Sequence, residues 1–198
     1  MNTIVRQHFK DLRSEFTLER NEAFQYLINR AKQPVDWVYE VWNELLDLTK
    51  TGDSHQRTLA VQLLAALAKS DVEIRLVNDL HDLIAVTYDD RFVTARQALK
   101  ALWKVGVASV QLQEMIIKEL SARFLNCNVE KNCKLIRCDI IEVLGKMYNT
   151  INNEHIKETV VLLIATEDEH KYQKKYNRLW NDIFKKKNKH SDYIIKML

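Results

Sequence analysis

The 198-residue chain is 46% hydrophobic and 29% charged, which suits one domain that buries a sizeable core without metal or disulfide staples. Only three glycines and one proline are present, which argues against a sheet protein with many turns and favours an all-α protein. The formal net charge of +3 indicates no partner by itself, so the positions of the charges matter more than their sum.

The sequence lacks the patterns of secreted, membrane-spanning and zinc-binding proteins. Charges recur every few residues through residues 1–16, and the densest apolar run, residues 59–68, has about half of the roughly 20 residues that a membrane helix needs. Cys127, Cys133 and Cys138 follow the spacing C-x5-C-x4-C, which matches no paired zinc motif. We therefore expect a cytoplasmic protein with free, reduced thiols, no membrane contact, no metal and no cofactor.

The first predicted elements are three helices in succession. A lone helix over residues 3–16 is expected to cap the fold, and residues 18–32 carry apolar side chains on one stripe at helical spacing. Pro34 is expected to pre-set the first turn of the next helix, residues 35–50, which Gly52 ends. Residues 18–32 and 35–50 then form a helical hairpin.

The same unit recurs along the rest of the chain. Asp and Ser residues stand before several of the later helical patterns, where their side chains can cap a helix N-terminus. The expected pairs are residues 55–69 with 72–87, 91–106 with 110–125, 130–148 with 154–165, and 168–187 with a short terminal helix from Ser191.

An internal alignment indicates true repetition. Residues 59–70, laid over residues 94–105 and 136–147, bring Leu67, Leu102 and Leu144 into one column. The spacings of 35 (102 minus 67) and 42 (144 minus 102) are uneven, which disfavours tetratricopeptide repeats with their regular 34-residue period.

Two of these segments resemble HEAT repeats, whose first helix commonly ends in an Ala-Leu-Gly-x-Leu-Gly pattern after an acidic opening. The matching stretches are ALWKVG at residues 101–106 and VLGKM at residues 143–147, preceded by Asp89-Asp90 and Glu130. The resemblance implies an α–α superhelix of about five HEAT-like pairs with an N-terminal capping helix, as a single domain over residues 1–198. An ordinary helical bundle is the alternative, because the family's turn proline occurs only in the first pair.

The resemblance also implies that second helices line an inner, concave surface. In the first two pairs these helices carry seven acidic residues against Lys50 and Arg75. We therefore expect a non-catalytic interaction scaffold whose partly acidic surface binds a basic or polar protein partner. The predicted protein-binding residues are Tyr39, Asn43, Asp47, Asp79 and Asp82.

Nucleic-acid binding is the alternative function. Arg96, Lys100 and Trp103 fall on one helical stripe, and an indole flanked by cations can stack on bases. Against this, the column of Trp103 holds Ala68 and Gly145, which is typical of a position where neighbouring repeats touch. A second basic stripe, which contains almost no acidic residues, lies near the C-terminus. It includes Lys171, Lys174, Lys175 and Arg178. The aromatic stripe of the same segment, predicted to be buried, is Tyr172, Tyr176, Trp180 and Phe184.

Catalytic signatures are lacking. Some HEAT-like proteins are alkylpurine DNA glycosylases, and Asp36, Trp37 and Trp42 are the only candidates for such a cluster, in a groove of the wrong charge. The six histidines are scattered, no glycine-rich loop is present, and neither Cys133 nor Cys138 has a neighbouring base in the sequence. No catalytic residue is predicted.

Overall fold

The computed structural model describes the backbone of residues 1–195 and the side chains of residues 1–183, and every regular element in this part is helical. The elements are α1 (Thr3–Asp11), α2 (Thr17–Arg30), α3 (Val38–Thr51), α4 (Ser54–Leu67), η1 (Ala68–Ser70), α5 (Leu76–Val86), α6 (Phe92–Gly106), α7 (Val110–Asn126), η2 (Cys127–Val129), α8 (Cys133–Ile151), α9 (Glu154–Ala165) and α10 (His170–Ile195). The prediction of an all-α fold built from consecutive helices is confirmed.

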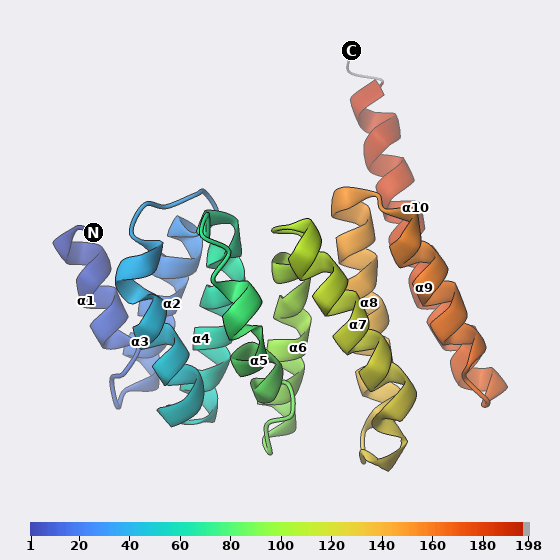
Figure 1. The fold of residues 1–198 in the computed structure, drawn as a ribbon, viewed down its shortest axis with the longest axis horizontal. Helices are drawn as coiled ribbons and strands as arrows, with labels where there is room; N and C mark the ends of the chain where they lie inside the picture. Colours follow the sequence, from blue (N-terminus) through green and yellow to red (C-terminus); the bar gives the residue numbers. More distant parts are fainter. Residues whose placement is uncertain (196–198) are drawn as a thin grey trace. The chain divides into compact units, whose positions relative to one another are not determined.

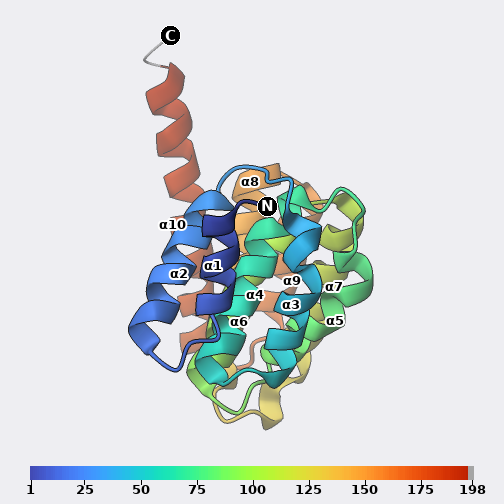
Figure 2. The ribbon, with the colours of Figure 1, turned by 90° about the vertical axis from the view of Figure 1, so that its left-hand side faces the viewer.

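The chain forms two compact units, Met1–Leu112 and Gln113–Leu198. In the first unit, α4 packs between α2 and α6, while α3 packs on α5 (Figure 1). The helix α1 packs on α2. The Arg6–Glu44 ion pair joins it to α3, and its Phe9 ring makes an edge-on contact with the ring of Trp37, just before α3, at 5.5 Å between centroids. Figure 2 shows the row of α2, α4 and α6 to the left of α3 and α5.

The central helix of this unit, α4, owes its place to its apolar run. All residues from Leu59 to Ala68 are buried except Gln62, which is half-buried. A helix that is apolar nearly all round must be covered on most sides, and α2, α3 and α6 cover this one. Gln62 therefore marks the one strip of this stretch that reaches the surface.

Two equivalent ion pairs tie successive members of the row together. Arg20 of α2 binds Asp53, which precedes α4, at 2.5 Å, and Arg57 of α4 binds Asp89, which precedes α6, at 2.6 Å. The two arginines stand 37 residues apart (57 minus 20). Asp53 also caps α4 in a capping box with Gln56, as its sequence position predicts.

Some predicted boundaries are wrong. α1 ends at Asp11, and α3 begins at Val38, so Pro34 lies in the preceding loop instead of the first helical turn. α5 begins at Leu76 instead of residue 72 because the Asp71 carboxylate, 7% exposed, accepts hydrogen bonds from the backbone N–H groups of Arg75 and Leu76.

In the second unit, α8 packs against both α9 and α10 (Figure 1). Tyr176 and Trp180 are buried, as predicted, whereas Tyr172 is only half-buried, and Phe184 lies outside the described side chains. Gly145 faces Ile183, and a Cβ atom there would lie 2.6 Å from the Ile183 Cδ1, so the small residue permits the close approach of α8 and α10. The short helix predicted from Ser191 is wrong, since α10 continues to Ile195 through a stretch without Gly or Pro.

The predicted state of the cysteines is also wrong. The Sγ atoms of Cys127 and Cys133 form a disulfide, and Cys138 lies outside it. The prediction rested on spacing and on the expected compartment, whereas the turn η2 brings these two side chains together. Within the described residues, no helix has the length and apolar character needed to cross a membrane.

Candidate functional site

The predicted protein-binding residues all lie on the α3–α5 face of the first unit. Tyr39, Asn43 and Asp47 follow one stripe of α3, and Asp79 and Asp82 lie on the adjoining α5. We call this surface the α3–α5 face. It is the acidic surface that the sequence predicts to bind a basic or polar protein partner.

Most charges on the α3–α5 face are neutralised within the chain. Asp47 binds Arg13, which follows α1, at 2.6 Å, and Asp82 binds Lys50 at 2.8 Å. Further pairs join Glu40 to the Met1 amino group, Glu44 to Arg6, and Glu73 to Arg75. The face is therefore less acidic than its composition indicates.

The other polar groups of this face are also engaged. Asp79 accepts a hydrogen bond of 2.7 Å from the Trp42 indole nitrogen. The Tyr39 hydroxyl donates to Asp71 at 2.9 Å and accepts from the Glu73 backbone N–H at 2.7 Å, and burial raises the pKa of Tyr39. Asn43 is exposed.

The cluster considered for a DNA glycosylase has little exposed aromatic surface. Trp37 is 5% and Trp42 is 1% exposed, so both indoles belong to the core, while Asp36 is exposed beside them. A base held by stacking needs an accessible ring face, which these two side chains do not offer.

The predicted nucleic-acid residues belong to two different units. Arg96, Lys100 and Trp103 lie on α6 of the first unit and are all half-buried, with the Arg96 guanidinium 5.6 Å from the centre of the Phe92 ring. On α10 of the second unit, four exposed cations follow one another: Lys171, Lys174, Lys175 and Arg178. Lys171 binds Glu169 at 3.4 Å and Arg178 lies 4.0 Å from Asp182, whereas Lys174 and Lys175 have no ion-pair partner among the described residues.

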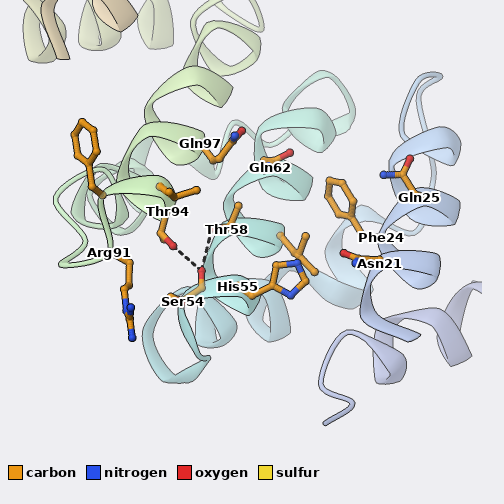
Figure 3. A pocket seen from close by; sticks show the side chains of 13 residues that line it. Asn21, Phe24, Gln25, Ser54, His55, Thr58, Gln62, Arg91, Thr94 and Gln97 are labelled. Carbon is orange, nitrogen blue, oxygen red and sulfur yellow. Dashed lines mark hydrogen bonds between the residues drawn. The ribbon is translucent and has the colours of Figure 1, made fainter. Parts of the chain in front are cut away.

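A groove that the sequence analysis did not anticipate crosses the row of α2, α4 and α6. It has a volume of about 740 Å³ and lies within the first unit (Figure 3). Its lining is mostly neutral amide, hydroxyl and apolar side chains, from Asn21, Phe24, Gln25, Ser54, His55, Thr58, Leu59, Gln62, Arg91, Phe92, Val93, Thr94 and Gln97.

The floor of the groove is made by α4. The Thr58 and Thr94 hydroxyls both donate to the Ser54 carbonyl at 2.9 Å, so neither hydroxyl hydrogen is available to a ligand (Figure 3). The bond from Thr94 also holds the α6 end against α4. Burial, followed by the charge of Arg20, lowers the pKa of His55, so this side chain is neutral at physiological pH. Of the described residues that line the groove, none is acidic.

Four carboxamides of this groove, from Asn21, Gln25, Gln62 and Gln97, are named here the groove amides. None of them has a hydrogen bond to any other described residue. Gln25 and Gln97 are exposed on the walls, while Gln62 is half-buried on the floor. A carboxamide carries two donors and an acceptor, so the groove presents several hydrogen-bonding groups to whatever enters it.

The sequence contains a signal for this groove. Gln62 and Gln97 occupy one column of the internal alignment, 35 residues apart (97 minus 62), and Gln25 precedes Gln62 by 37 residues (62 minus 25). The latter spacing equals that of Arg20 and Arg57, and Gln25 and Gln62 are each the ninth residue of their helix, whereas Gln97 is the sixth residue of α6.

Comparisons with known proteins bear on the fold alone. No family model matches the sequence, and no curated protein matches it. The crystal structure of an engineered protein is similar, with a TM-score of 0.56 and 17% sequence identity, over 92% of this chain and 80% of that chain. Within the described residues, no group of three or more His, Cys, Asp or Glu side chains is arranged to hold a metal ion.

Proposed function

We propose that this chain is a HEAT-like helical-repeat scaffold that binds a protein partner and does so through the groove over α4. The repeated Arg20–Asp53 and Arg57–Asp89 pairs support a repeat architecture, because each joins one helix to the loop before the next helix of the row. The observation that carries the proposal is the open groove with its four groove amides, spread over three helices.

A protein partner fits this surface better than a small charged ligand. The groove crosses successive helices, and among the described residues of its lining the one charged side chain is Arg91, beside the neutral His55. Neutral donors and acceptors of this kind complement polypeptide, whose main chain is neutral and carries one donor and one acceptor per residue.

Site-specific photo-crosslinking tests the proposal. Benzoylphenylalanine placed at residue 62 or 97 in cells is expected to give the same discrete protein adduct from both positions. The control position is Gln111, an exposed helical glutamine of the first unit that does not line the groove. Absence of an adduct from both groove positions, or the same adducts from residue 111, contradicts the proposal.

Nucleic-acid binding is a second candidate, and the exposed cations of α10 favour it. Lys174 and Lys175 are solvent-exposed neighbours on the helix. Binding of labelled double-stranded DNA, measured by fluorescence anisotropy, is expected to weaken steeply with salt if these side chains contact phosphates. The double variant K174E/K175E should then lower both the affinity and the salt slope, and unchanged values in that variant contradict this candidate.

A further inference from the structure

We propose that the occupant of the groove is an extended peptide segment in the polyproline II conformation, which crosses α2, α4 and α6 and is held by its main chain. In this arrangement Gln25, Gln62 and Gln97 each bind one peptide group, and the three peptide groups are three residues apart in the peptide sequence. The inference rests on the proposed function, since it names the kind of partner segment that the groove over α4 accepts.

The spacing of the helices carries the argument. α4 packs against both α2 and α6, and packed helices lie about 8–10 Å apart, so the side chains that line the groove from successive helices are separated by about that interval. A polyproline II helix has three residues per turn and rises about 3.1 Å per residue, or about 9.3 Å per turn. Peptide groups three residues apart therefore face the groove in the same orientation, one at each glutamine.

Other peptide conformations fit this row less well. In a β-strand, equivalent peptide groups recur every second residue, at about 6.6–6.8 Å, which is shorter than the helix spacing. An α-helix satisfies its own main-chain groups internally and would leave the groove amides without partners. A polyproline II segment has no internal hydrogen bonds, so its carbonyl and N–H groups are available to carboxamides.

The chemistry of the lining agrees with main-chain recognition. A carboxamide both donates and accepts, which matches the two groups of a peptide unit, and the near absence of charge among the described lining residues favours neutral partners. Apolar surface is offered beside the amides chiefly by Val93, which is 72% exposed, while Phe24 in the opposite wall is 9% exposed. These side chains can contact prolines or other apolar residues of the segment.

The experiment uses random dodecapeptides displayed on phage and selected on the full chain. Enriched sequences are resynthesised with fluorescein, and their affinity is measured by fluorescence anisotropy. Each binder is then methylated at one backbone nitrogen at a time. We expect about a fivefold loss, the worth of about one hydrogen bond, at nitrogens three residues apart, with little change between them.

Protein variants complete the test. The triple variant Q25A/Q62A/Q97A is expected to lose at least about tenfold in affinity for the selected peptides, while the control Gln111→Leu keeps it. Melting temperatures are expected to stay unchanged, because Gln25 and Gln97 are exposed and Gln62 is half-buried, and this shows that the lost affinity does not come from unfolding.

Three results overturn the inference. They are the enrichment of no peptide, a two-residue or absent period in the methylation scan, and equal affinity of the triple variant and the native chain. A crosslinked adduct at residues 62 and 97 together with any of these results leaves the scaffold function standing and shows that the groove binds a folded surface. Failure of both experiments removes the groove as a functional site.

Discussion

The α3–α5 face and the groove over α4 belong to the same unit, yet they treat their polar groups in opposite ways. On the α3–α5 face, carboxylates are held by Arg13, Lys50 and Trp42 across neighbouring helices. In the groove, the groove amides have no partner among the described residues. Counting charged residues therefore points to the α3–α5 face, whose polar groups are largely paired within the chain. The groove over α4, which is nearly neutral, is the surface with unpaired hydrogen-bonding groups among the described residues.

The strongest test of this contrast removes a polar group that is fully engaged. Asp71→Ala deletes the acceptor of the Tyr39 hydroxyl and of the Leu76 N–H group at a site that is 7% exposed. The free energy of unfolding should fall by about 3 kcal/mol in urea titrations, because buried donors are left unpaired. Asp36→Ala, at an exposed position before α3, is the control and should change it by less than about 0.5 kcal/mol. Equal effects of the two changes would break the contrast.

A pH titration extends the comparison to the buried carboxylate of the second unit. Burial raises the pKa of Glu167, but hydrogen bonds from Lys134, the Glu169 N–H and Arg137 outweigh it and lower the pKa from 4.5 to about 2. The folded-state pKa is thus below the unfolded one, so the stabilisation is complete above pH 4.5 and is lost as the pH falls through 2. The contribution is up to about 3 kcal/mol.

Urea titrations between pH 5 and pH 2 measure this contribution. Glu167→Gln should flatten the decline of stability over that interval, and Glu158→Gln, which removes an exposed carboxylate of α9, should not. The same slope in the native chain and in Glu167→Gln would show that this carboxylate does not couple to folding.

A smaller effect is expected from the exposed ion pairs that neutralise the α3–α5 face. A double-mutant cycle on Arg13 and Asp47, whose side chains are 46% and 54% exposed, should give a coupling of about 0–1 kcal/mol that shrinks with salt. This value fits a pair that a partner can displace. A coupling above about 2 kcal/mol would show that the face is closed to partners by its own cations.

The smallest effect is expected in the groove. Gln62→Leu should leave the free energy of unfolding within about 0.5 kcal/mol of the native value or raise it, because a half-buried amide is exchanged for an apolar side chain. Thermal unfolding followed by circular dichroism measures this, and the affinity for the selected peptides should fall about fivefold in the same variant. A clear destabilisation would show that Gln62 serves the fold instead of a ligand.

Much of the fold follows from local patterns. A helix was predicted over residues 55–69, and in its apolar run at residues 59–68 every residue except Gln62 is buried. Asp53 and Gly52 mark the helix ends that their chemistry predicts. The start of α5 was missed because the Asp71 carboxylate binds the N–H groups of Arg75 and Leu76. The Tyr39 hydroxyl, 32 residues earlier, also donates to Asp71, and no local pattern records that contact.

The candidate site was predicted less well than the fold. Acidic residues of α3 and α5 were placed correctly on one face, but their partners lie 34 residues away for Asp47 and 37 residues away for Asp79. The repeat of Gln62 and Gln97 was visible in the alignment, although nothing in it distinguishes an unpaired amide from a paired one.

The sequence by itself determined the helices, most of their limits and the side that each one buries, because periodicity and capping act over three or four residues. Only the tertiary structure decided which polar groups are satisfied, that Cys127 meets Cys133 across a turn, and that three glutamines from α2, α4 and α6 line one groove. These features depend on the packing of helices and on the exact path of a turn, and hydrogen bonds and covalent bonds form only between atoms that the fold brings within a few ångströms.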